Sequence, residues 1–130
     1  MEIERVEVLA LRQRLREPLG NAQRWESSRA ALLVKVTTSK GLVGWGECHG
    51  SPELCAPIVN DFLGPRVIGQ DPLKTAVLWE NLYQRGREYG RQGLFLSALS
   101  GLDLALWDLK GKALGVSVAT LLGGARGPQL

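Results

Sequence analysis

The sequence lacks the long apolar segments that mark membrane proteins and secreted precursors. No stretch of its 130 residues approaches the roughly 20 consecutive apolar residues needed to span a bilayer. Glu and Arg residues interrupt the apolar positions of the N-terminal stretch, so it has no apolar segment of the kind found in signal peptides. We therefore expect a cytoplasmic protein with no membrane partner.

Cysteine is also scarce, which excludes a disulfide scaffold. The chain has two cysteines, Cys48 and Cys55, and one histidine, His49. These three residues are close in sequence, but no fourth ligand follows at a spacing typical of zinc sites. We expect two reduced thiols and no metal site within the chain.

Neither sign of charge dominates, although the balance is basic. There are 16 Lys and Arg against 13 Asp and Glu, for a net charge of +3. Arg12, Arg14 and Arg16 alternate, so a strand would bring them to one face. That face could bind nucleic acid or another anion, or it could be the solvated side of an edge strand. We favour the edge strand and expect no nucleic-acid partner, because no aromatic residues interleave with these arginines to stack on bases.

The composition that remains is that of a soluble globular domain. Apolar residues make up 45% of the chain and charged residues 22%, which favours one domain with a real core over residues 1–130. Residues 3–15, 30–38 and 42–48 are rich in β-branched and other apolar residues and predict three strands. Turn-forming residues at 17–21 and a polar stretch to residue 28 predict an exposed loop between the first two strands. A tight turn at residues 39–41 predicts an antiparallel meander.

The third predicted strand carries glycines at alternating positions. Gly44 and Gly46 share one of its faces, and Val43 and Trp45 share the other. Glycines in such a pattern indicate that another segment packs close to the strand backbone.

The second half of the chain has helical periodicity. Ser51 as N-cap and Pro52 predict a helix over residues 52–63, ended by Gly64 and Pro65. Asp71 and Pro72 predict a second helix over residues 71–83. The stretch SALSGLDLALWDLKGKALG, residues 97–115, predicts a long third helix with Gly115 as its C-terminal cap. Strands followed by three main helices indicate an α+β fold.

The long helix is apolar on two sides. At about 100° per residue, one broad arc is free of polar residues and should face the core of the chain. That arc contains Phe95, Ala98, Leu99, Leu102, Ala105, Leu106, Leu109 and Ala113. A second patch contains Leu96, Leu104, Trp107 and Leu114. The second patch predicts a further partner, either another copy of the chain or another domain.

Two carboxylates on this helix could suggest catalysis. Asp103 and Asp108 are five residues apart, which sets them about 140° apart around the helix. They cannot share a proton or a metal ion, so we interpret both as structural, with Asp108 within reach of Lys112 one turn on.

The segment ALSGLDLALWDLKGKALGVSVATLLGG, residues 98–124, resembles the end of the N-terminal capping domain of the mandelate racemase and muconate lactonizing enzyme group. This group belongs to the enolase superfamily. The segment LLVKVTTSKGLVGWGE, residues 32–47, agrees with the hairpin of such domains. The resemblance covers essentially the whole chain, and it is more specific for the family than for the reaction.

The resemblance implies a two-domain enzyme in which an α+β cap sits over a C-terminal (β/α) barrel. In that superfamily Mg²⁺ stabilises the ene-diolate formed when a base removes the proton α to a carboxylate, and such groups lie at the C-terminal ends of barrel strands. No residue of this chain matches a catalytic or metal-binding position of the family. We expect the chain to end where the barrel would begin and to be inactive without it.

The resemblance also implies that two loops of the cap select a small carboxylate substrate. We expect an acid-sugar dehydratase or racemase, and the sequence does not distinguish these reactions from cycloisomerisation. By position these loops are residues 19–25 and 48–51. They contain the expected substrate-binding residues Leu19, Asn21, Gln23, Arg24, Trp25, Cys48 and His49. Asn21 and Gln23 can donate and accept hydrogen bonds, Arg24 can pair with a carboxylate, and Leu19 and Trp25 can exclude water.

We also expect a homo-oligomer. The connector at residues 85–93 is interpreted as a hinge or subunit contact. It is not interpreted as a phosphate site, because it lacks the G-x-G-x-x-G spacing of phosphate-binding loops. The alternative from another class is a non-enzymatic α+β module that self-associates through the patch around Trp107.

Overall fold

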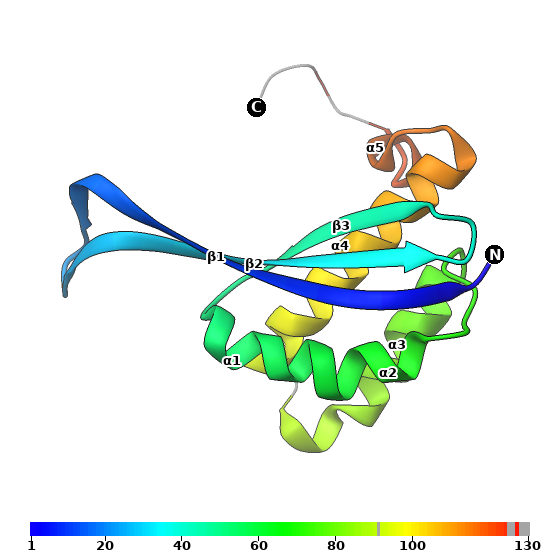
Figure 1. Cartoon of the computed structure of the whole chain (residues 1–130), viewed down its shortest axis with the longest axis horizontal. Helices are drawn as coiled ribbons and strands as arrows, with labels where there is room; N and C mark the ends of the chain where they lie inside the picture. Colours follow the sequence, from blue (N-terminus) through cyan, green and yellow to red (C-terminus); the bar gives the residue numbers. More distant parts are fainter. Residues whose placement is uncertain (91, 125–126, 128–130) are drawn as a thin grey trace.

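The computed structural model describes residues 1–90, 92–124 and 127, and it consists of an antiparallel sheet followed by helices (Figure 1). The strands are β1 (Ile3–Gly20), β2 (Trp25–Thr38) and β3 (Val43–Cys48), in the order β1-β2-β3. The helical segments are α1 (Pro52–Pro57), the π-helix η1 (Ile58–Leu63), α2 (Gly64–Val67), α3 (Thr75–Arg85), the 3-10 helix η2 (Arg87–Tyr89), α4 (Leu94–Leu114) and α5 (Val118–Leu121). The predicted α+β class and antiparallel meander are confirmed.

Strands β1 and β2 are longer than the sequence pattern indicates. Pairing of β2 with β3 stops at Leu32 and Cys48, whereas pairing of β1 with β2 continues to Gly20 and Trp25. Residues 11–31 therefore form a two-stranded arm that projects from the body of the domain (Figure 1). The predicted loop over residues 17–28 is wrong, since only residues 21–24 lie outside the strands.

Pro18 does not end β1 because of where it lies in the sheet. β1 is an edge strand, and its pairing with β2 is irregular between Arg14 and Leu19. Proline is tolerated at an edge or an irregularity because no ladder hydrogen bond needs its missing N–H. Arg12, Arg14 and Arg16 thus lie on an edge strand, as predicted.

The first helical run also continues past its predicted end. Gly64 and Pro65 do not stop it: the π-helix η1 leads directly into α2, which reaches Val67. Pro65 lies in the first turn of α2, where its missing N–H costs little. A Cβ on Gly64 would lie 3.4 Å from the Cβ of Val6, so this glycine permits close packing on β1 and does not act as a stop signal.

The second predicted helix starts later than expected. Asp71 and Pro72 form a turn before α3, which begins at Thr75. The Asp71 side chain accepts a hydrogen bond from the backbone N–H of Leu73 (3.1 Å), and its carbonyl oxygen accepts one from Lys74 (3.2 Å). Asp71 therefore stabilises a turn and is not a helix cap.

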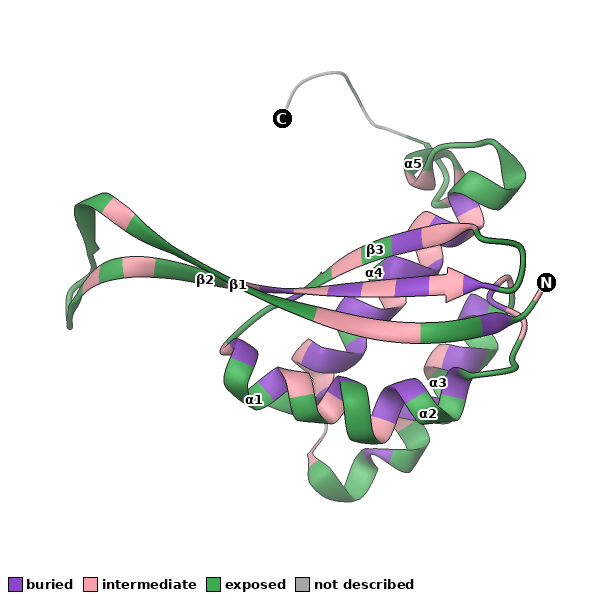
Figure 2. Ribbon diagram, viewed as in Figure 1, coloured by how far each residue is buried: buried purple, intermediate pink, exposed green. Residues whose placement is uncertain are grey.

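Helix α4 supplies much of the hydrophobic core. Its buried apolar residues are Phe95, Ala98, Leu99, Leu102, Ala105, Leu106 and Leu109. They pack with alternate residues of β2, of which Leu32, Val34 and Val36 are fully buried (Figure 2). Ala113 was predicted in this arc but is exposed, because it lies in the last turn of the helix. Gly115 has φ = 67°, the left-handed conformation of the predicted C-terminal cap.

The alternating glycines of β3 lie directly against α4. A Cβ on Gly44 would overlap the carbonyl oxygen of Ala105, and a Cβ on Gly46 would overlap that of Gly101. In return, a Cβ on Gly101 would overlap the sulfur of Cys48. The predicted close approach is confirmed, and the packing segment is the backbone of the longest helix.

The second apolar patch of α4 is only partly open. Leu104 and Leu114 are 52% and 51% exposed. Leu96 instead packs against the core, and Trp107 is half-buried with the Lys110 ammonium 5.1 Å from its ring centroid. The interpretation of Trp107 as the centre of a free surface is therefore weakened, while Leu104 and Leu114 remain uncovered.

We predict that Gly46→Ala destabilises the domain by about 2–3 kcal/mol, because the new methyl group meets helix backbone that cannot rotate away. Urea unfolding followed by circular dichroism measures this. The matched control is Glu47→Ala, an exposed neighbour on the same strand, which should change the free energy of unfolding by less than about 0.5 kcal/mol. Stabilisation by Gly46→Ala, as expected for an unhindered strand glycine, would contradict the close packing.

Candidate functional site

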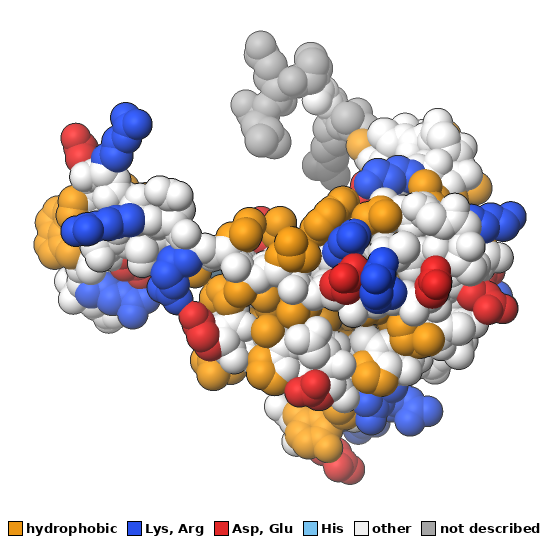
Figure 3. Space-filling view, viewed as in Figure 1, with side chains coloured by type: hydrophobic (Ala, Val, Ile, Leu, Met, Phe, Trp, Pro, Cys, Tyr) orange, Lys and Arg blue, Asp and Glu red, His pale blue; other side chains and the backbone are white. Residues whose placement is uncertain are grey.

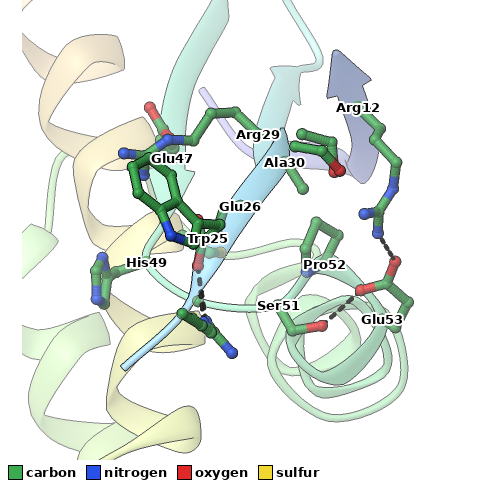
Figure 4. Close-up of a pocket in the computed structure, with 15 residues that line it drawn as sticks. Arg12, Trp25, Glu26, Arg29, Ala30, Glu47, His49, Ser51, Pro52 and Glu53 are labelled. Carbon is green, nitrogen blue, oxygen red and sulfur yellow. Dashed lines mark hydrogen bonds and ion pairs between the residues drawn. The ribbon is translucent and has the colours of Figure 1, made fainter. Parts of the chain in front are cut away.

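The arm stands out from the rest of the domain in the space-filling view and carries several Arg side chains (Figure 3). A polar groove of about 740 Å³ lies between the arm and the turn that joins β3 to α1 (Figure 4). It forms because β2 continues beyond the end of β3, so that residues 25–31 of β2 have no strand on their second side. The groove is lined by Arg12, Arg24, Trp25, Glu26, Ser27, Ser28, Arg29, Ala30, Glu47, Cys48, His49, Gly50, Ser51, Pro52 and Glu53. Two segments far apart in the sequence thus share one site.

The groove brings together four of the seven residues predicted to bind substrate. Arg24 and Trp25 lie where the turn of the arm leads into β2, and Cys48 and His49 lie where β3 leads into the turn before α1. Leu19, Asn21 and Gln23 lie at the far end of the arm and do not line this groove. Of the first predicted loop, residues 19–25, only its last two residues therefore lie beside the second predicted loop, residues 48–51.

Asn21 has a structural partner in the turn at the end of the arm. Its side-chain oxygen accepts hydrogen bonds from the backbone N–H groups of Gln23 (2.9 Å) and Arg24 (3.0 Å). The Asn21 N–H also donates to the Arg24 carbonyl (3.0 Å). Asn21 therefore holds the reversal of the chain at this turn.

Trp25 and Leu19 leave apolar surface open near the turn. Trp25 is 77% exposed and Leu19 is 49% exposed. The Trp25 ring covers Gly20, where a Cβ would lie 2.8 Å from the indole. Glycine at position 20 thus allows the indole to lie flat across the paired strand.

Cys48 lines the groove, but its thiol belongs to the core. The residue is 2% exposed, and its sulfur lies 3.8 Å from the Ala98 carbonyl oxygen. Burial, reinforced by nearby Cys55 and Glu47, raises the pKa of the Cys48 thiol to about 11. Burial also raises the pKa of Cys55. Both thiols therefore stay protonated near neutral pH, which makes them poor nucleophiles and poor metal ligands.

A hydrogen-bonded link that the sequence did not indicate joins the arm to α1. Arg12 donates to Glu53 at 2.6 Å, and the Ser51 hydroxyl donates to the other oxygen of Glu53 at 2.5 Å (Figure 4). The hydrogen bond from Ser51, with smaller effects of the Glu53 backbone N–H and of Arg12, lowers the pKa of Glu53 to about 2. Glu53 therefore connects both segments that form the groove.

We predict a pKa of about 2 for Glu53, which NMR titration of its side-chain carboxyl carbon measures directly. Ser51→Ala should move this pKa toward the ordinary value of 4.5, and by more than Arg12→Gln does, because the Ser51 hydrogen bond is the largest cause. Ser28→Ala, which changes another groove residue outside this link, should leave it unchanged.

The sign of the effect on stability follows from the lowered pKa. The link stabilises the folded chain above the ordinary carboxyl pKa and is lost as the pH falls toward 2. A pKa near 4.5 for Glu53 in the unmodified protein would contradict the link.

The described residues do not provide a magnesium site. Among them, no group of three or more His, Cys, Asp or Glu side chains could hold a metal ion. Asp108 has other partners, since its side chain accepts hydrogen bonds from the backbone N–H of Trp45 (2.8 Å) and from the Lys112 ammonium (2.6 Å). Burial raises the pKa of Asp103, against the opposing effect of a hydrogen bond from Trp107. The structural interpretation of Asp108 and its pairing with Lys112 are confirmed.

Within the described part of the chain, none of the helices has the length and apolar character required to cross a membrane.

Residues 3–123 match the family model for the mandelate racemase/muconate lactonizing enzyme N-terminal domain. The chain belongs to this family. The match covers the sheet, the arm, the groove and all of the described helices.

Two curated proteins that resemble this chain are a cycloisomerase and a dehydratase. The chain is 44% identical over 124 residues to D-galactarolactone cycloisomerase of Agrobacterium fabrum, covering 95% of this chain and 32% of that protein. It is 44% identical over 95 residues to D-galactonate dehydratase of Verminephrobacter eiseniae, covering 72% of this chain and 24% of that protein. The chain thus spans about a quarter to a third of the length of these relatives.

Solved structures agree with this assignment. The 3,6-anhydro-D-galactonate cycloisomerase of Zobellia galactanivorans superposes with a TM-score of 0.86 at 33% identity, over 98% of this chain and 33% of that one. A member of the enolase superfamily from Agrobacterium tumefaciens superposes with a TM-score of 0.82 at 32% identity, over 95% of this chain and 37% of that one. The fold described above is therefore that of the N-terminal domain of these longer proteins.

Proposed function

We propose that this chain is the substrate-selecting cap of a Mg²⁺-dependent acid-sugar dehydratase or cycloisomerase of the enolase superfamily. The observation that carries the proposal is the juxtaposition of the arm and the 48–51 turn around one polar groove, in a chain whose relatives act on acid sugars. Racemisation is a further possible reaction of the same chemical type, because all three reactions begin with removal of the proton α to a carboxylate.

The groove suits a hydroxylated acid. His49 can donate hydrogen bonds to carboxylate or hydroxyl oxygens, and Arg24 can do so through the N–H groups that its pair with Glu26 leaves free. The exposed indole of Trp25 can exclude water when a substrate binds. Leu19 and Gln23, at the end of the arm, would reach a substrate only if the arm bends toward the bound partner. Cys48 would only form part of the groove wall and would not bind the substrate through its thiol, since the thiol faces the core.

The catalytic groups would come from a C-terminal barrel. The carboxylates described here do not fit a Mg²⁺ site, so no step of the reaction is assigned to residues of this chain. The metal, held by the barrel, would stabilise the ene-diolate when bound. The role of this chain would be to bind and orient the substrate and to exclude water.

The uncovered leucines of α4 support a docked partner. Leu104 and Leu114 are each about half exposed, and Leu104 lies beside the outer strand β3 at Gly46. We propose that the barrel of the same enzyme covers this surface and that the enzyme forms a homo-oligomer in the cytoplasm. Two free, buried thiols suit a reducing compartment. The alternative of a self-associating module without activity is less favoured, because the relatives that this chain resembles are enzymes.

The experiment that tests the proposal is a chimera in which this chain replaces the matching N-terminal segment of D-galactarolactone cycloisomerase. We predict that the chimera converts acid sugars or their lactones in the presence of Mg²⁺, while the 130-residue chain alone does not. Substrate consumption measured by NMR across a panel of aldonates, aldarates and their lactones tests both statements.

The parent cycloisomerase serves as the positive control, and circular dichroism establishes that the chimera is folded. A folded chimera that binds and converts no acid sugar would contradict the proposed function. Turnover of an acid sugar by the isolated chain would contradict the assignment of catalysis to the barrel.

A further inference from the structure

Two of the three arginines that line the groove are already paired with carboxylates. Arg12 lies 2.6 Å from Glu53, and Arg24 lies 2.7 Å from Glu26. Arg29 is the third, and no ion pair or side-chain hydrogen bond joins it to any described residue. Its positive charge is therefore available to a ligand.

The position of Arg29 directs it to the side of the groove that carries Trp25. Both residues occupy odd positions of β2 and so share one face of the arm, away from the face that holds Arg12 and Glu53. Figure 4 shows the Arg29 side chain extending from β2 to the part of the groove where Trp25 and Glu47 are labelled. An indole and a guanidinium thus border the same space.

Glu47 is the second unpaired charge in this part of the groove. It is exposed at the end of β3, and no described side chain makes an ion pair with it. An unpaired guanidinium beside an unpaired carboxylate offers both donors for an anion and acceptors for hydroxyl groups. Hydroxyl groups can hydrogen-bond to either side chain, but only an anion would also neutralise the charge of the arginine.

We propose that Arg29 binds the distal carboxylate of a diacid sugar and that Glu47 accepts hydrogen bonds from the hydroxyl groups beside it. This inference rests on the proposed function, in which the barrel holds the carboxylate next to the reacting carbon and the cap meets the other end of the substrate. A planar guanidinium forms two parallel hydrogen bonds with a carboxylate but not with a primary alcohol. The cap therefore selects a diacid over the monoacid of the same stereochemistry.

D-Galactarate and D-galactonate are the matched probes, because they have the same hydroxyl configuration and differ in having a carboxylate or a primary alcohol at C6. Isothermal titration of the chimera with each acid should give a dissociation constant about 10- to 100-fold lower for galactarate, the range expected for a charge-assisted pair. Arg29→Gln should abolish this preference, and Arg29→Lys should retain part of it because the charge remains.

Glu47→Gln is the matched control. It should weaken binding of galactonate, whose hydroxyl groups lose a charged acceptor, and should keep the preference for galactarate, because Arg29 is unchanged and a like charge beside the second carboxylate is removed. Equal affinity for the two acids in the unmodified chimera, or an Arg29→Gln variant that keeps the preference, would overturn the role of Arg29 while leaving the proposed function intact. A folded chimera that binds neither acid would overturn both.

Discussion

The contact between α4 and the glycines of β3 determines where everything else in this domain can lie. Because Gly44 and Gly46 have no side chains, the backbone of the helix rests directly on the backbone of the strand. This brings the buried face of α4 against β2 and closes the core. It also fixes the end of β3, from which the turn that carries His49 departs. The position of the site therefore depends on the short distance between β3 and α4, which Gly44 and Gly46 permit.

The same contact separates the domain into a body and an arm. The body has a shared hydrophobic core, whereas residues 11–31 are held mainly by pairing of two strands and by the link from Arg12 to Glu53. An isolated two-stranded ribbon is marginally stable in water. One wall of the groove is thus rigid and the other pliable, which fits the proposed role of a cap that admits a substrate and then closes over it. The rigid wall carries His49 and Glu47, and the pliable wall carries Arg29 and Trp25.

Local pattern was enough to predict the three strands, the long helix with its Gly115 cap and the close approach at the glycines. The local pattern failed where a residue that usually ends a strand or helix instead has a role in tertiary packing. Pro18 lies on an edge strand and Gly64 packs on β1, so neither ends its element. Four of the seven predicted binding residues share the groove, but the sequence gives no sign that Glu53 pairs with Arg12 across 41 positions. Arg12 reaches Glu53 because β1 and β2 extend into the arm. The polar and turn-forming residues at 17–28 predict a loop there, so the sequence does not indicate the arm.

Amide hydrogen exchange on the 130-residue protein measures how the contact between α4 and β3 holds the fold together. We predict that the amides of β3 and of the middle of α4 are the slowest to exchange and that they exchange together, as one unit that opens only on global unfolding. Amides of the arm beyond residue 11 should exchange faster, through local opening. If the middle of α4 exchanged as fast as the arm, or independently of β3, the contact between helix and strand would not be the foundation of the fold.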